Sequence, residues 1–126
     1  MHAIPGATAT ITLIVAKADT ALGIGSGDVP VLGTPRLVAL CEQAAVAAVA
    51  PALDPGETTV GTRVEIDHLA ATPVGATVIA RAALESVEGR ALVFSSTVHQ
   101  GERLVARAVI HRMLVDKRRF LERAGA

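Results

Sequence analysis

The chain has 126 residues and a mass of 12.9 kDa, and its 12 basic and 12 acidic side chains give a formal net charge of zero. Hydrophobic residues make up 51% of the chain, aromatic residues make up 2%, and Cys41 is the single cysteine. This composition excludes intrinsic disorder, a disulfide-stabilised scaffold and a nucleic-acid binder with a basic or aromatic surface, and it predicts one globular domain over residues 1–126.

The N-terminal part of the chain predicts a strand, a loop and a long helix. Residues 7–15 alternate threonine with apolar side chains, which is typical of a half-buried strand. Residues 21–32 are rich in glycine and predict a loop. Residues 35–50 are apolar nearly all round and predict a helix buried on most sides, with Thr34 as its N-cap and Pro35 at its first position.

The rest of the chain predicts four consecutive strands, over residues 58–71, 77–87, 91–100 and 103–115, followed by a short basic helix. Short turns between consecutive strands favour antiparallel pairing, and the sheet must cover the apolar helix. We therefore predict an α+β hotdog fold, in which an antiparallel sheet wraps around one long central helix. Because such a sheet has unpaired edges, we also predict a homodimer, or a higher oligomer built from it.

Export and membrane signals are lacking in the sequence. Residues 1–20 have neither the basic start nor the continuous apolar run of a signal peptide. The longest apolar run, residues 44–50, is about a third of the roughly 20 residues that a membrane helix needs. We therefore expect a cytoplasmic protein with no membrane partner.

Two polar residues fall on elements that must pack together. Glu42 lies on the apolar helix, one turn from Val38 and from Val46. An acid there faces a polar cavity or a partner, or it occupies an exposed position on an incompletely covered helix. His68 alternates in phase with Ile66, so it is either a satisfied core histidine or a catalytic group. An acid and an imidazole across one interface are typical of acid–base catalysis.

Other polar residues also have alternative roles. Thr34 caps the helix, or its hydroxyl serves at the positive helix end, where developing oxyanions are stabilised. Arg112 is in phase with the apolar Ile110 and requires an anionic partner. Cys41 is expected to be a small buried hydrophobe, because no neighbouring cation favours its thiolate. The histidines lack metal-ligand spacing, so we predict no metal site.

The neutral net charge conceals an asymmetry along the chain. Residues 1–102 hold 5 basic and 10 acidic side chains, whereas residues 103–126 hold 7 and 2. Lys117, Arg118 and Arg119 are consecutive in the basic segment. This segment is either a solvated surface or a site for phosphates.

Several stretches of the chain carry a family resemblance. They are Gly33-Thr34, Glu42 eight positions after that threonine, APALDPGETTVGT at residues 50–62, His68 followed by LAATPVG, and LESVEGRAL at residues 84–92. A weaker similarity continues through Arg112 to Phe120. Together these stretches resemble the fluoroacetyl-CoA thioesterase family of single-hotdog acyl-CoA thioesterases.

The resemblance implies hydrolysis of an acyl-CoA thioester to a free acid and CoA at a dimer interface, with no metal and no cofactor besides the CoA of the substrate. It implies catalytic roles for Thr34, Glu42 and His68, and it implies that Gly61 and Arg112 hold the thioester. Under this hypothesis the phosphates of CoA contact Lys117, Arg118 and Arg119. Thr34 and Glu42 are eight residues apart, or about 12 Å along a helix, so we expect no direct hydrogen bond between them within one subunit.

One departure concerns substrate selectivity. The fluoroacetate-specific enzyme carries phenylalanines in a lid before its catalytic threonine, whereas residues 21–32 form a shorter loop without an aromatic residue. We therefore expect no selectivity for fluoroacetyl-CoA. A non-catalytic hotdog protein that binds acyl-CoA or another small ligand is the alternative. A hotdog dehydratase or hydratase is disfavoured, because those enzymes usually pair His with Asp in a different local motif.

Overall fold

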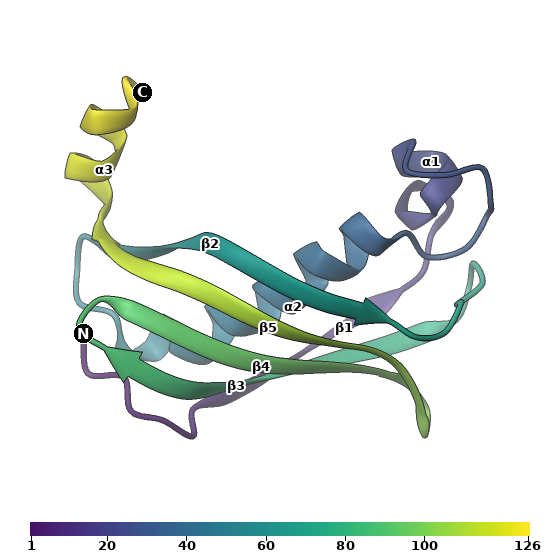
Figure 1. Ribbon diagram of the computed structural model, residues 1–126, viewed down its shortest axis with the longest axis horizontal. Helices are drawn as coiled ribbons and strands as arrows, with labels where there is room; N and C mark the ends of the chain where they lie inside the picture. The colour runs from purple at the N-terminus through teal and green to yellow at the C-terminus, as the bar shows by residue number, and fades with distance from the viewer.

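The computed structural model describes residues 1–126 and contains a five-stranded antiparallel sheet that packs against one long helix (Figure 1). The strands are β1 (Thr8–Ile14), β2 (Glu57–His68), β3 (Thr77–Glu88), β4 (Ala91–Gln100) and β5 (Arg103–Asp116). The long helix is α2 (Thr34–Val49), and the shorter helices are α1 (Ala21–Ile24) and α3 (Lys117–Ala124). The predicted α+β hotdog fold is confirmed.

The sheet has the strand order β1-β3-β4-β5-β2. Helix α2 follows β1 and leads to β2 at the opposite edge of the sheet, which explains why strands adjacent in sequence lie farthest apart. Each edge strand pairs on one side only: β1 with β3, and β2 with β5. Both edges of the sheet therefore remain open in a single chain.

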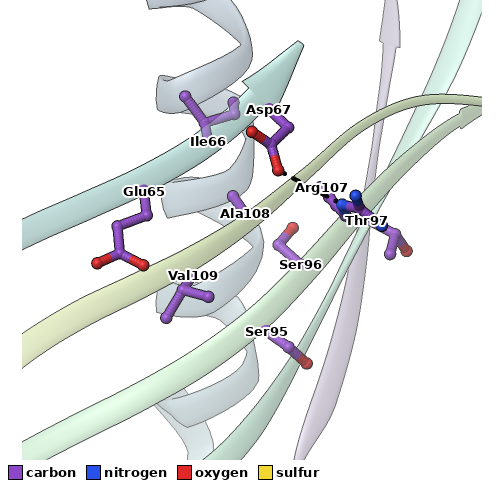
Figure 2. A pocket seen from close by; sticks show the side chains of 9 residues that line it. All are labelled: Glu65, Ile66, Asp67, Ser95, Ser96, Thr97, Arg107, Ala108 and Val109. Carbon is purple, nitrogen blue, oxygen red and sulfur yellow. Dashed lines mark hydrogen bonds and ion pairs between the residues drawn. The ribbon is translucent and has the colours of Figure 1, made fainter. Parts of the chain in front are cut away.

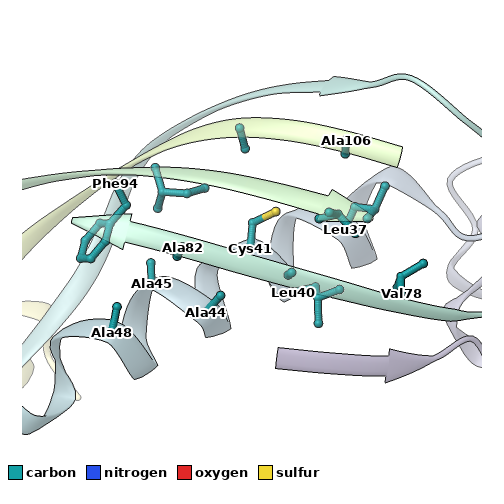
Figure 3. Packing of buried hydrophobic residues seen from close by; sticks show 14 of the residues in the cluster. Leu37, Leu40, Cys41, Ala44, Ala45, Ala48, Val78, Ala82, Phe94 and Ala106 are labelled. Carbon is teal, nitrogen blue, oxygen red and sulfur yellow. The ribbon is translucent and has the colours of Figure 1, made fainter. Parts of the chain in front are cut away.

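The core lies between α2 and the inner face of the sheet. Figure 3 shows Cys41 and the alanines of α2 close to the strands, with Phe94 as a large buried side chain of the sheet. Alanines at this interface let the helix approach the sheet closely. The buried residues of α2 are Leu37, Leu40, Cys41, Ala44, Ala45, Ala48 and Val49.

The expectation that α2 is buried on most sides is met only in part, since most of its residues are buried or half-buried but one stripe is open. Gln43 is exposed and Val46 is 42% exposed. The buried residues of the helix face the sheet, and Gln43 and Val46 lie outside that face. An apolar residue such as Val46 therefore remains available for contact with another molecule.

The start of α2 also differs from the prediction. Gly33 is the N-cap residue, with an extended backbone (φ −79°, ψ 145°), and Thr34 is the first residue of the helix. The Thr34 hydroxyl therefore does not cap the helix and can bind elsewhere. In the predicted loop before it, α1 is capped by Thr20, whose Oγ1 accepts a hydrogen bond from the Gly23 amide at 3.0 Å.

Strand β2 ends at His68 and contains a β-bulge that the alternation in the sequence does not predict. Gly61 pairs with Arg112 on β5, and the following residue, Thr62, is left without a partner. The extra residue reverses the alternation of side chains. As a result, Thr59 and Gly61 lie on the inner face of the sheet together with His68. Strict alternation back from His68 would instead place the two neighbours of Gly61 on that face.

The predicted C-terminal basic helix is present as α3. Its N-cap is Asp116, whose carboxylate accepts a hydrogen bond from the Arg119 amide at 3.0 Å, and it ends at Gly125 in a left-handed conformation. Helix α3 stands away from the sheet, at the end of the molecule opposite α1 (Figure 1), and all its residues are exposed. No helix in the structure is long and apolar enough to span a membrane.

Candidate functional site

Thr34 and His68 form a hydrogen-bonded pair. The Oγ1 atom of Thr34 lies 2.8 Å from Nδ1 of His68, and the pair joins the first residue of α2 to the last residue of β2. The other ring nitrogen of His68, Nε2, is buried and has no hydrogen-bond partner. A hydroxyl and an imidazole at this distance can exchange a proton.

Glu42 and Arg112 form a second pair. Nη1 of Arg112 donates to Oε2 of Glu42 at 2.9 Å, so Arg112 has the anionic partner that its position in the sequence requires. The arginine side chain is 9% exposed and the glutamate side chain 32%. The Glu42 carboxylate is therefore partly accessible to solvent, whereas the Arg112 guanidinium is buried.

Thr59 holds the rest of the Arg112 guanidinium. Nε of Arg112 donates to Oγ1 of Thr59, and Nη2 donates to the Thr59 carbonyl oxygen, both at 2.9 Å. All three guanidinium nitrogens are thus engaged, which fixes the group that orients Glu42. The sequence pattern missed Thr59 because the bulge in β2 turns it inward. A glycine within an otherwise regular strand pattern is the only signal for that bulge.

Gly61 leaves space for the Glu42 carboxylate. A Cβ atom at this position would lie 2.5 Å from Oε2 of Glu42 and 3.3 Å from Nη1 of Arg112. The φ angle of Gly61 is not positive, so the backbone does not require a glycine there. The bulge therefore places a residue without a side chain opposite Arg112, and Glu42 occupies the space.

The two pairs do not meet within one chain. No hydrogen bond joins Thr34 or His68 to Glu42 or Arg112. Eight residues of α2 separate Thr34 from Glu42, which corresponds to about 12 Å along the helix axis. The structure therefore brings the predicted site residues together as two groups rather than one.

A large groove lies beside the Thr34–His68 pair. Its volume is about 710 Å³, and α1, the loop after it and the start of α2 form its walls. The hydrophobic side chains of Val29, Val31 and Val38 line it together with Thr34 and His68. The pair thus faces a cavity of the size that binds small molecules.

A second groove, of about 630 Å³, opens on the outer face of the sheet. Figure 2 shows its lining residues on β2, β4 and β5 with the helix behind the strands. It contains an exposed ion pair in which Asp67 and Arg107 approach within 3.4 Å, and none of the predicted site residues lines it. Of the two pairs, Thr34–His68 lines the first groove, and Glu42–Arg112 lines neither.

The basic C-terminal segment does not form one patch. Arg107 and Arg112 lie on β5 and are paired with Asp67 and Glu42. On α3, the exposed residues Lys117, Arg118 and Arg119 diverge around the helix. Arg119 lines a hollow of about 150 Å³ with Arg90 and Arg123, whereas Lys117 and Arg118 do not line it.

Cys41 lies in the core, where burial raises the pKa of its thiol. A buried thiol with a raised pKa is a poor nucleophile, so Cys41 acts as a packing residue. No group of three or more His, Cys, Asp and Glu side chains lies close enough to hold a metal ion.

Comparisons with known proteins place these features in a family. Residues 15–118 match the model of the fluoroacetyl-CoA-specific thioesterase family. The fluoroacetyl-CoA thioesterase of Streptantibioticus cattleyicolor is 45% identical over 86 residues, which cover 64% of this chain. The match spans 62% of that protein, less than two thirds of its length.

Solved structures agree with the sequence match. A structure of the fluoroacetyl-CoA thioesterase FlK has a TM-score of 0.90 at 31% identity, covering 97% of this chain and 95% of that one. A hypothetical protein of the thioesterase superfamily from Thermus thermophilus has a TM-score of 0.87 at 27% identity, covering 99% and 98%. Structures of FlK mutants with ligands are among the similar structures, including one with fluoroacetate and CoA and one with acetyl-CoA.

The family match covers every element from the end of β1 to the start of α3, including both side-chain pairs. It confirms the resemblance carried by the sequence motifs. The chain belongs to the fluoroacetyl-CoA-specific thioesterase family of hotdog thioesterases.

Proposed function

We propose that this protein hydrolyses acyl-CoA thioesters to a free acid and CoA. The observation that carries the proposal is the 2.8 Å hydrogen bond between Thr34 and His68 at the wall of a groove of about 710 Å³. A nucleophile-type hydroxyl bonded to an imidazole beside a substrate-sized cavity is the arrangement that acyl transfer needs. Membership in a thioesterase family supports the same reaction.

In the proposed reaction His68 accepts a proton from the Thr34 hydroxyl, or from a water molecule that this hydroxyl orients. The deprotonated oxygen attacks the thioester carbonyl and forms a C–O bond. The C–S bond then breaks, and His68 returns the proton to the leaving sulfur. If Thr34 itself attacks, a water molecule releases the acyl group in a second step. Thr34 lies at the positive end of α2, which favours negative charge on the carbonyl oxygen.

We further propose that the complete site forms between two subunits. The edge of β2 is unpaired, and Val38, Glu42 and Val46 form a stripe at helical spacing on α2. Two-fold antiparallel pairing of two β2 edges would bring the His68 end of one strand near the Gly61 end of the other. Thr34 and His68 of one subunit would then face the partner's Glu42, Gly61 and Arg112, which hold and polarise the thioester.

We assign the CoA phosphates to the basic helix α3 of the partner subunit, because α3 of the same chain lies at the end of the molecule opposite α1 and the groove. The same pairing of two β2 edges would bring the partner's α3 toward the His68 end of β2. Lys117, Arg118 and Arg119 are exposed and free of the sheet, and Arg119 shares its hollow with two other arginines. Arginine side chains bind phosphate in a bidentate manner, and they attract a polyanion over a distance. Under this assignment, the residues that bind the phosphates of CoA are distinct from Thr34 and His68, which carry out the reaction.

Single substitutions test the catalytic set. Thr34→Ala, Glu42→Gln and His68→Ala are each expected to lower kcat for a hydrolysed acyl-CoA by about 10²–10⁴-fold, measured by thiol release. Thr62→Ala, at the exposed bulge beside Gly61, is the control and should retain wild-type turnover. Wild-type turnover by Glu42→Gln or His68→Ala would contradict the assignment.

Mixed dimers test the shared site. A dimer of one His68→Ala subunit and one Glu42→Gln subunit would have one site with both changes and one site with neither. Co-purified mixed dimers are therefore expected to recover up to about half of the wild-type kcat, although each parent is inactive. Mixed dimers as inactive as their parents would show that each site lies within one subunit.

We also propose that the enzyme is not selective for fluoroacetyl-CoA. Both phenylalanines lie away from the groove, Phe94 in the core and Phe120 on α3, so no aromatic side chain encloses the acyl group. The kcat/KM values for fluoroacetyl-CoA and acetyl-CoA should agree within about tenfold. A panel of acyl-CoAs that bind without release of thiol would instead identify a non-catalytic acyl-CoA binding protein.

A further inference from the structure

We infer that the groove beside Thr34 and His68 takes an uncharged aliphatic acyl group longer than acetyl. This inference deepens the proposed function and rests on it, because it assigns the groove to the acyl part of the thioester. It concerns the class of substrate, which neither the family match nor the catalytic residues specify.

The chemistry of the groove wall excludes a charged acyl group. No Lys, Arg, Asp or Glu side chain lines the groove, and its polar side chains are those of Ser26, Thr34 and His68. That lining belongs to one subunit, and in the proposed dimer the partner's Arg112 would lie beside the thioester, but its three guanidinium nitrogens are already engaged by Glu42 and Thr59. A carboxylate at the end of the acyl group would therefore lose its hydration and find no free cation. The hydrophobic walls formed by Val29 and Val38 favour methylene and methyl groups instead.

The groove is larger than a two-carbon acyl group requires. A volume of about 710 Å³ lies within the range of roughly 300–1,000 Å³ that binds whole small-molecule ligands. An acetyl group bonded near Thr34 would leave most of the apolar wall in contact with water. Each additional methylene buried against this wall should tighten binding about fourfold.

The wall is held in place by backbone and side-chain hydrogen bonds. The Ala21 amide donates to the Val31 carbonyl at 2.8 Å, and the Leu22 amide donates to the Val29 carbonyl at 3.1 Å. Thr20 is buried and caps α1 at the base of the loop. The loop is therefore a closed unit with a defined inner surface, and its shape sets the class of acyl group before the substrate arrives.

Four-carbon substrates with and without a charge provide the direct test. We expect kcat/KM for butyryl-CoA to exceed that for acetyl-CoA by about 15-fold, as two buried methylenes imply. We expect it to exceed that for succinyl-CoA, which has the same chain length, by at least 100-fold. Equal use of succinyl-CoA, or acetyl-CoA as the best substrate, would overturn the inference.

A substitution in the wall of the groove tests whether the acyl group binds there. Val38→Phe fills part of the groove, so the ratio of kcat/KM for butyryl-CoA over acetyl-CoA should fall at least fivefold. The matched control is Ile79→Phe, because Ile79 is 46% exposed on β3 and does not line the groove. Its ratio should equal that of the wild type. A ratio that Val38→Phe leaves unaltered would place the acyl group elsewhere.

Measurements of ligand affinity distinguish a failure of this inference from a failure of the proposed function. The thioethers S-butyl-CoA and S-(3-carboxypropyl)-CoA cannot be hydrolysed, and calorimetry gives their Kd values for the wild-type protein. If no thioester in the panel releases thiol, hydrolysis is refuted, but an affinity at least 100-fold higher for S-butyl-CoA still supports the uncharged aliphatic class. Equal affinity for the two thioethers overturns that class whether or not hydrolysis occurs.

Discussion

The space beside Gly61 is occupied by the Glu42 carboxylate, and a methyl group there would lie 2.5 Å from Oε2. Gly61→Ala should therefore push the carboxylate away from Arg112 and lower kcat/KM about 10–100-fold. Since Gly61 is exposed and the Glu42 side chain is 32% exposed, the carboxylate can turn toward solvent, and the free energy of unfolding should change by less than about 1 kcal/mol. Thr62→Ala, one residue away, is the control for both measurements. An alanine variant with full activity would show that the carboxylate position does not matter.

Thr59 tests whether the orientation of Arg112 matters. Thr59→Val removes the hydroxyl that accepts from Nε of Arg112 and leaves a buried N–H unpaired, which destabilises the fold by about 1–3 kcal/mol. Thr59→Ser keeps the acceptor and should restore both stability and kcat. Urea unfolding and thiol release measure the two effects. If valine and serine variants have equal kcat, Thr59 has only a packing role.

Helix α3 provides a test of where CoA phosphates bind. Arg119→Glu combined with Arg123→Glu reverses two charges in the hollow shared with Arg90. The KM for the acyl-CoA should rise at least tenfold and lose most of its salt dependence, because fewer cations meet the phosphates. Lys117→Glu combined with Arg118→Glu makes the same change in net charge outside the hollow and should raise KM less. Equal effects would indicate attraction by net charge rather than a defined site.

The turn that leads into β2 makes stability depend on pH. The Asp54 amide donates to Oε1 of Glu57 at 2.7 Å, and this hydrogen bond lowers the pKa of the Glu57 carboxyl. A pKa below that of the unfolded chain, about 4.3, means that the stabilisation is present above pH 4.3 and is lost as the pH falls through the folded pKa. Glu57→Gln should therefore flatten the acid limb of the stability curve. Glu102→Gln, in an exposed turn without an ion pair, should leave it unaltered.

The inner faces of β2 and α2 illustrate the limits of periodic patterns. Alternation in the sequence correctly places His68 and Arg112 on the inner faces of β2 and β5, because a regular strand repeats every two residues. It fails at Thr59 and Gly61, because the bulge adds one residue to β2 but not to β5. The extent of burial of α2 is also overestimated, since an apolar composition does not reveal how much of a helix the sheet covers.

The open edge of β2 and the uncovered stripe on α2 lead to a prediction about assembly. Val46 is 42% exposed on that stripe, and Val46→Arg should place a charge in the proposed dimer interface. Sedimentation should then detect monomers, with the secondary structure retained and kcat lost together with the dimer. Ile79→Arg, on the outer face of the sheet, is the matched control and should remain dimeric. A wild-type protein that is monomeric and fully active would contradict the shared site.

The order and type of the elements follow from local periodicity and turn residues, which depend only on near neighbours in the chain. For this reason the sequence alone was enough to predict the hotdog fold and to place Glu42 and His68 on elements that pack together. Which side chains touch depends on strand register and on how α2 lies on the sheet, and both result from packing the whole core. Thr34 meets His68 across 34 residues, and Glu42 meets Arg112 across 70. Those long-range contacts divide the site residues into two pairs. They also place Gly61 and Thr59 beside the Glu42–Arg112 pair.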